Sequence, residues 1–443
     1  MLSGVSPSGL QYAVRRSGSA VAYCALSIRC GTRDEAGFPC GIAHFTGHTL
    51  FRGTQRKSAG VISGYLDRLG GELNAYTTKE EIVLHATVLK EDLPKAARLL
   101  FELATEPSFP AREIETERGV VLDEIISYKD NPAEDAYDRF EGLLFAGHPL
   151  ENPILGTSQS VRKITPEQLR AFTARYFVPG RMAFSVVADI DESLLEKRLL
   201  KLFASVFPSF PPSPAPQGGT SCLTETAKEG SFRHTEAAPS CHAESSYRPG
   251  APHAVLPPPP PFDKTIDKHH HEVNAVLGGV APSLYQEKER IVTAVLANLL
   301  GGPASNSLLN RELREKRGWV YGVECNYTQY ADTGIIVISF GCDKPNLQRC
   351  LGAVDRILAR LREVPLSPRQ LAATRKQLLA QLAVSSDNGE AQCLSMGKSL
   401  LAWGRISTPG ELRAQVEAVT AEDLLLAARS LFSPDRLSRL LYL

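Results

Sequence analysis

The sequence has no excess of charge of either sign. Its 443 residues include 49 Lys and Arg against 49 Asp and Glu, so the formal net charge is zero. Proteins that bind nucleic acids usually carry a basic excess that neutralises phosphates, and this chain has none overall. Because 43% of the residues are apolar and only 22% are charged, the composition also excludes a disordered chain. We therefore expect a folded protein with no nucleic-acid partner.

The sequence also lacks long apolar runs and paired cysteines. Its apolar runs are far shorter than the roughly 20 residues that a membrane helix needs, so no membrane association is expected. The amino-terminal stretch MLSGVSPSGLQYAVRR has no basic start followed by an apolar segment, and no signal peptide is predicted. The nine cysteines are scattered without a Cys-x-x-Cys pair. This pattern favours reduced thiols and a cytoplasmic location.

Proline is concentrated in one segment of the chain. Residues 208–262 hold 13 of the 30 prolines, with many Ser and Thr and little apolar periodicity. Such a segment cannot bury enough surface to offset the entropy lost on ordering. We predict a flexible linker that is stiffer where prolines are dense. It separates an amino-terminal domain, residues 1–207, from a carboxy-terminal domain, residues 263–443.

The two flanks of this linker are similar to each other. The segments TPEQLRAFTARYFVPGRMAFSVVA, from Thr165, and TAEDLLLAARSLFSPDRLSRLLYL, from Thr420, each begin with a Thr N-cap and continue as an amphipathic helix and a strand. The offset is 255 residues there and 254 residues between similar helices near Leu93 and Leu347. A stable offset across about 70 residues argues for duplication. Two unrelated helices with similar caps are the alternative.

Each copy follows the order strand, helix, β-hairpin, helices, strand. In the first copy we predict strands at residues 22–28, 73–76 and 82–89 and helices at 42–51 and 61–69. In the second copy we predict strands at 273–280, 321–327 and 334–342 and a helix at 287–300. Helices and strands are segregated rather than strictly alternating. This arrangement favours an α+β fold of two homologous α/β-sandwich domains.

The helix GIAHFTGHTLFRGT carries two histidines, His44 and His48. A spacing of four places both imidazoles on one helical face, where they can converge on one metal ion. The helix IETERGVVLDEIISYKD offers Glu117 and Glu124, seven residues apart and so also on one face. Two histidines and one carboxylate with an open position form a catalytic zinc arrangement. Two partly exposed histidines on an amphipathic helix are the alternative.

Several motifs, in order, resemble the pitrilysin/insulinase family of zinc metallopeptidases, the inverted zincins. They are CGTRDEAGFPCGIAHFTGHTLFRGT, LGGELNAYTTKEEIVLHATVL, ERGVVLDEI and LREKRGWVYGV. The family motif is His-x-x-Glu-His with a distal Glu. The resemblance implies that His44, His48 and Glu124 bind Zn²⁺ and that Glu117 is a supporting acid. Positions 254 residues after the histidines hold Asn298 and Gly302, so we expect one site per chain.

The resemblance also implies substrate contacts in both halves. It identifies an edge strand that holds peptide backbone by strand pairing, made of Asn74, Ala75, Tyr76 and Thr77. In the second half, Arg314 and Tyr321 match the family's arginine–tyrosine motif. Tyr321 would donate a hydrogen bond to the developing oxyanion, and Arg314 would orient the peptide. An exposed ion-pairing Arg and a core Tyr are the alternative.

The sequence departs from the family motif at one position of the site. Gly47 stands where the family has the Glu that takes a proton from the attacking water. Loss of a positioned general base typically costs about 10²–10⁴ in rate. Zinc binding is expected to persist, because this base is not a ligand. The sequence therefore predicts a metal-competent protein with impaired peptide hydrolysis.

Two functions remain open at this stage. One is a zinc endopeptidase, with residual activity, that binds extended peptides in a closed chamber. The other is a non-catalytic binding or assembly subunit that partners an active paralogue. By resemblance we expect a dimer, either a homodimer or a heterodimer with such a paralogue.

Overall fold

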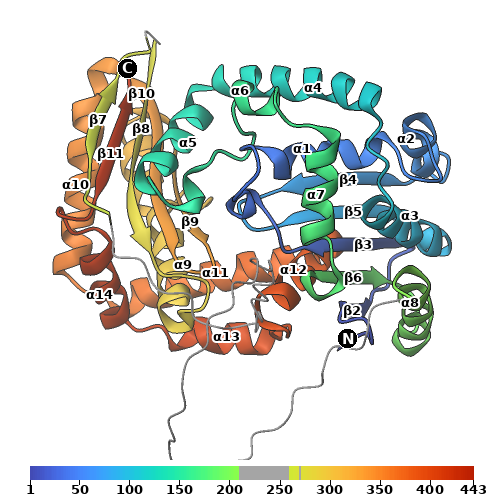
Figure 1. Ribbon diagram of the computed structural model, residues 1–443. Helices are drawn as coiled ribbons and strands as arrows, with labels where there is room; N and C mark the ends of the chain where they lie inside the picture. Colours follow the sequence, from blue (N-terminus) through green and yellow to red (C-terminus); the bar gives the residue numbers. More distant parts are fainter. Residues whose placement is uncertain (209–258, 269–270) are drawn as a thin grey trace, which may run out of the picture.

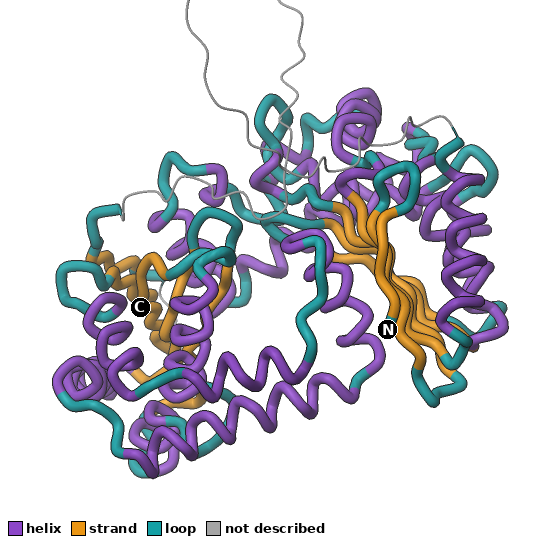
Figure 2. The backbone as a smooth tube through the Cα atoms, turned by 90° about the horizontal axis from the view of Figure 1, so that it is seen from below, coloured by secondary structure: helices purple, strands orange, loops and turns teal. Residues whose placement is uncertain are grey.

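The structure of the chain, a computed structural model, describes residues 1–208, 259–268 and 271–443. Its strands form two sheets, and Figures 1 and 2 show them in two separate lobes. Most of the predicted proline-rich linker, residues 209–258, lies outside the described residues. In the described part of the chain, no helix combines the length and the apolar character needed to cross a bilayer.

The first sheet has the strand order β1-β2-β6-β3-β5-β4. Its strands are β1 (Leu2–Val5), β2 (Gln11–Arg16), β3 (Val21–Ile28), β4 (Glu72–Thr77), β5 (Ile82–Leu89) and β6 (Met182–Ala188). Neighbouring strands are antiparallel except β2 and β6, which are parallel. Every residue of β6 is buried, because both faces of the sheet are covered. β4, in contrast, lies at an edge of the sheet.

Helices of the amino-terminal half surround this sheet. They are α1 (Ile42–Thr49), α2 (Ala59–Asp67), α3 (Leu93–Thr105), α4 (Ala111–Lys129), α6 (Ser158–Val161), α7 (Pro166–Tyr176) and α8 (Glu192–Val206). Phe101 of α3, Phe184 of β6 and Phe203 of α8 are fully buried, with ring centroids 5.0–6.0 Å apart. This aromatic cluster joins two helices to one face of the sheet and forms the centre of the first core.

The second sheet has the strand order β7-β11-β8-β10-β9. Its strands are β7 (Asp263–Ile266), β8 (Glu272–Ala281), β9 (Val320–Gln329), β10 (Gly334–Asp343) and β11 (Ser438–Tyr442). The helices beside it are α9 (Glu287–Gly301), α10 (Leu347–Glu363), α11 (Pro368–Asp387), α13 (Pro409–Ala418) and α14 (Ala421–Leu431). β9 lies at one edge of this sheet, next to β10, so its position corresponds to that of β4 beside β5 in the first sheet.

The two halves repeat one order of elements, as the sequence predicts. The series β3, α1, β4, β5, α3 in the first half corresponds to β8, α9, β9, β10, α10 in the second. The predicted Thr caps are also present: the backbone N–H of Gln168 donates to Thr165 Oγ1 at 3.3 Å, and that of Asp423 donates to Thr420 Oγ1 at 3.0 Å. The α+β fold and its two homologous domains are confirmed.

One helix from each half packs on the sheet of the other half. α5 (Pro132–Leu144) contacts β8 and β11, and α12 (Gly389–Trp403) contacts β3 and β6 (Figure 1). Phe140 of α5 is fully buried with Val337 of the second sheet, and Met396 of α12 is buried with Val187 of the first. The boundaries predicted at residues 207 and 263 stay a prediction. The exchanged helices mean that neither segment by itself contains all of the helices that cover its sheet.

Charged side chains dock the turn between β9 and β10 onto the first lobe. Arg33 donates to both oxygens of Asp332, at 2.7 and 3.2 Å, and also contacts Glu80. The backbone N–H of Ala331 donates to Glu80 at 2.9 Å. A buried ion pair of 3.1 Å joins Lys79 to Glu141 of α5. The docked turn therefore contacts segments that flank both α1 and β4.

Candidate functional site

A buried carboxylate anchors the start of α1, the helix with the two histidines. Glu35 accepts hydrogen bonds from the backbone N–H groups of Gly41, at 2.9 Å, and Ala43, at 3.0 Å. Burial raises the pKa of Glu35 to about 7, although these hydrogen bonds oppose the rise. Gly41 has a φ of +88°, which favours glycine. These contacts determine where α1 begins and so where its histidines point.

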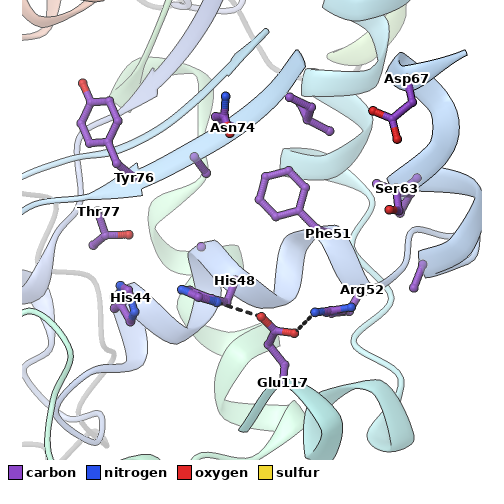
Figure 3. A pocket seen from close by; sticks show the side chains of 15 residues that line it. His44, His48, Phe51, Arg52, Ser63, Asp67, Asn74, Tyr76, Thr77 and Glu117 are labelled. Carbon is purple, nitrogen blue, oxygen red and sulfur yellow. Dashed lines mark hydrogen bonds and ion pairs between the residues drawn. The ribbon is translucent and has the colours of Figure 1, made fainter. Parts of the chain in front are cut away.

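His44 and His48 lie on one face of α1, as their spacing predicts. Their ring centroids are 4.5 Å apart (Figure 3). Oε2 of Glu124, on α4, lies 3.1 Å from Nε2 of His44 and 3.4 Å from Nε2 of His48. The hydrogen bond with His44 is the main reason that the pKa of Glu124 is held below its ordinary value. The structure thus brings together the three predicted ligands.

Glu117 lies directly behind His48. Its Oε1 accepts a hydrogen bond from His48 Nδ1 at 2.8 Å, and its other oxygen contacts the guanidinium of Arg52. Burial acts to raise the pKa of Glu117, but the hydrogen bond with His48 and the charge of Arg52 outweigh it and lower this pKa. Because Nδ1 is engaged, Nε2 of His48 is the ring nitrogen directed at Glu124.

The donor set is suitable for a zinc ion. One ligand atom each from His44, His48 and Glu124 lies within 4.8 Å of the others, and no other such group of His, Cys, Asp and Glu occurs in the described part of the chain. Two imidazole nitrogens and one carboxylate oxygen, with the ring of His48 oriented by Glu117, match the chemistry of open zinc sites. The residues present therefore fit the metal that the sequence predicts.

Gly47 lies between the two histidines and is buried. Its φ is not positive, so the backbone does not require glycine there. A Cβ at this position would lie 3.0 Å from Oγ1 of Thr77. A side chain at position 47 would therefore point from α1 toward β4, and the carboxylate of the family motif is absent from that place.

A pocket opens beside the histidines, between α1, α2 and β4. It is lined by His44 and His48 and by the four predicted substrate-binding residues of the edge strand, Asn74, Ala75, Tyr76 and Thr77 (Figure 3). These four residues pair with β5 on one side, and no strand of the described residues pairs with β4 on the other side. The position of β4 thus leaves backbone groups available for pairing with an extended peptide.

The structure does not place Arg314 and Tyr321 in this pocket. Tyr321 lies on β9 with 62% of its side chain exposed, and its hydroxyl donates to Asp343 at 2.8 Å. Arg314 is exposed in the helical turn Asn310–Glu315. Neither residue lines the pocket that holds the histidines. Their contact with substrate stays a prediction.

Several residues of the pocket were not predicted from the sequence, among them Phe51, Arg52, Ser63 and Asp67. Arg52 follows His48 by four residues and could have been found from that spacing. Ser63 and Asp67 show the same spacing on α2, but only the fold reveals that this face of α2 lines the pocket of the histidines.

In the second copy, the end of the corresponding helix, α9, packs closely against the edge strand β9. Its positions Asn298 and Gly302 lie near the end of α9, where Gly301 packs against β9 so closely that a Cβ would be 2.4 Å from the backbone nitrogen of Cys325. Close packing thus fills the place where a pocket separates α1 from β4 in the first copy. One site per chain stays a prediction.

Both halves of the chain are similar to known proteins. Residues 12–158 match the family profile described as Insulinase (Peptidase family M16), and residues 163–378 match the profile described as Peptidase M16 inactive domain. An uncharacterized zinc protease of Mycobacterium tuberculosis is 28% identical over 406 residues, which are 92% of this chain and 84% of that protein. The uncharacterized zinc protease YmxG of Bacillus subtilis is 28% identical over 409 residues, 92% of this chain and 90% of its own.

Solved structures show the same fold. A protease from Helicobacter pylori has a TM-score of 0.81 at 19% identity, covering 100% of this chain and 98% of that chain. The peptidase M16 inactive domain from Pseudomonas fluorescens has a TM-score of 0.80 at 19% identity, covering 100% and 97%.

Proposed function

This chain belongs to the insulinase family, peptidase family M16, and we propose that it is a zinc-binding member that holds extended peptides but hydrolyses them slowly. Support for zinc comes from the convergence of His44, His48 and Glu124 and from the names of relatives as zinc proteases. When bound, zinc would supply Lewis acidity toward a peptide carbonyl and an attacking water.

The residues of the chain would divide the remaining tasks. Glu117, held by Arg52, keeps the ring of His48 oriented. The free edge of β4 would pair with the peptide backbone and place the peptide alongside α1. Both tasks are binding or positioning, and neither moves a proton to or from the reacting groups.

The observation that carries the proposal is the glycine at position 47. The carboxylates that line the pocket are Glu117 and Asp67. Glu117 is already paired with His48 and Arg52, and Figure 3 shows Asp67 on the α2 side, away from the histidines. Among the residues that the structure describes, no carboxylate therefore takes the position of the missing general base, so proton transfer during peptide hydrolysis would have no positioned acceptor there.

Restoring a carboxylate at position 47 tests this proposal. We expect Gly47→Glu to raise the rate of peptide cleavage by about 10²–10⁴, measured with a quenched fluorescent peptide library. Thr77 must move slightly to admit the new side chain, since its Oγ1 is 3.0 Å from the Cβ position. Gly47→Gln is the matched control, because it has the same size without a base, and it should stay slow. Zinc per chain should be unchanged in all three proteins.

Two outcomes would contradict the proposal in different ways. A wild-type protein that already cleaves peptides as fast as Gly47→Glu would show that another group supplies the base. A wild-type protein that binds no zinc would remove the metal site itself.

The same glycine also favours a second function, that of a non-catalytic subunit. In this form the chain would bind peptide or assemble with an active paralogue, and a chamber would close between the two subunits. The mass of the purified protein in solution tests whether the partner is a second copy. Isolating the chain from its own cells, together with the proteins bound to it, tests whether the partner is a paralogue. Cell fractionation tests the predicted cytoplasmic location in the same material.

A further inference from the structure

One face of α2 forms the wall of the pocket that lies opposite β4. Ala59, Ser63 and Asp67 are spaced by four residues, so they share one face of the helix, and all three line the pocket. Figure 3 shows Ser63 and Asp67 together on this wall, apart from Arg52 and Glu117. The pocket therefore has a polar end on α2 that is separate from the charged pair behind His48.

Asp67 is the unbalanced charge of this pocket. The other two charged side chains of the lining, Arg52 and Glu117, contact each other. Asp67 is exposed, and its carboxylate makes no hydrogen bond or ion pair with any residue in the parts of the chain that the structure describes. A cation that enters the pocket thus meets one carboxylate whose charge is not already neutralised.

The walls between the histidines and Asp67 are largely apolar. Phe51, Ile62 and Leu73 line this part of the pocket. A lysine or arginine side chain has an aliphatic stem that packs on apolar surface and a charged head that prefers a polar end. In a peptide paired with β4, alternate side chains point to the same side of the strand, so a side chain can be directed into the pocket.

We propose that Asp67 is a specificity-determining residue that selects peptides with a lysine or arginine side chain in this pocket. The stem lies against Phe51, Ile62 and Leu73, and the ammonium or guanidinium donates hydrogen bonds to the Asp67 carboxylate. The hydroxyl of Ser63, one turn earlier on α2, accepts a further hydrogen bond. This inference rests on the proposed binding of extended peptides at β4.

Peptide binding, rather than turnover, is the readout that fits a protein without its general base. The probes are eight-residue peptides in which one lysine is moved along an otherwise uncharged strand-forming sequence, each matched by a peptide with norleucine at that place. At one position we expect the zinc-loaded wild-type protein to bind the lysine peptide about three- to tenfold more tightly than its norleucine partner. This ratio should fall as salt is added, since Asp67 is exposed.

Asp67→Asn should bring that ratio to about one while the norleucine peptide keeps its affinity. Glu91→Gln is the matched control, because Glu91 is an exposed carboxylate outside β4 that does not line the pocket, and it should keep the wild-type ratio. A lysine preference that survives in Asp67→Asn, or the absence of any preference in the wild type, would overturn the role of Asp67. Failure of the wild type to bind any of the peptides would instead contradict the proposed function.

Discussion

At the scale of single residues, the site depends on how each acid is paired. Glu117 and Glu124 have lowered pKa values because histidine and arginine partners favour their ionised forms, although burial opposes this at Glu117. Glu35 is the opposite case, since burial dominates over its hydrogen bonds to backbone N–H groups and raises its pKa. Glutamates on α4 thus contact the two histidines, whereas the glutamate before α1 anchors the start of that helix.

The raised pKa of Glu35 predicts a pH dependence of stability. Its folded-state pKa is about 7, above the ordinary 4.5 that the unfolded chain should have. The folded protein therefore holds a proton that the unfolded chain releases between these values. Stability should fall as the pH rises from about 4.5 to 7, by about 3 kcal/mol at most from this group, and should not change further above 7.

Glu35→Gln removes this titration. We expect the free energy of unfolding of the wild type, relative to that of Glu35→Gln, to decline across this pH range in urea unfolding experiments. Glu167→Gln, at an exposed position of α7, is the control: it keeps Glu35, so the wild type relative to this variant should show no such decline. If the free energy of unfolding had the same pH dependence in the wild type and in Glu35→Gln, the raised pKa would not belong to Glu35.

At the scale of secondary-structure elements, the exchange of α5 and α12 makes each sheet depend on both halves of the chain. Met396 of α12 is 4% exposed and packs on the first sheet. We expect Met396→Ala to lower the free energy of unfolding by about 2–4 kcal/mol, because it leaves a cavity between the helix and the sheet. Hydrogen exchange should then increase in β3 and β6, which lie far away in the sequence.

Ser395→Ala provides the comparison for this prediction. Ser395 is the exposed neighbour of Met396 on the same helix, so its substitution should change stability by less than about 0.5 kcal/mol. If Met396→Ala affected exchange only in the second sheet, the two lobes would be energetically independent, and the exchanged helix would not couple them.

Many of these elements could be predicted from the sequence, and their partners could not. The strands, the caps at Thr165 and Thr420 and the helix with His44 and His48 follow from periodicity and capping, which are local properties. The helix predicted at residues 42–51 ends slightly early, at Thr49, and a short helical turn, Leu50–Arg52, follows it. The positions of α5 and α12 were not foreseen, because an apolar helical face indicates burial without indicating which sheet buries it.

At the scale of the whole molecule, the turn between β9 and β10 joins the second lobe to segments of the first lobe that flank α1 and β4. Asp332 is 7% exposed and accepts two hydrogen bonds from Arg33. We expect Asp332→Asn to cost about 2–3 kcal/mol of stability, because it leaves the charge of Arg33 only partly compensated. Amide hydrogen exchange should rise at residues 31–35 and 78–81, which flank α1 and β4.

Asp343→Asn is the matched variant for this measurement. Asp343 lies at the end of the same hairpin but is exposed, so its substitution should leave exchange at residues 31–35 unchanged. Equal exchange in Asp332→Asn and the wild type would show that the docked turn does not hold these segments.

The sequence by itself determined the local chemistry of this protein. Spacing placed two histidines on one helical face, the motifs identified the family and indicated its edge strand, and Gly47 was seen to stand where the family motif has a glutamate. Only the tertiary structure decided how distant elements pack: α5 and α12 each cover the sheet of the other half, and Asp67 of α2 lines the pocket of the histidines. The reason is that helical spacing is set by bonds between near neighbours, whereas contacts between distant segments depend on how the chain packs both sheets.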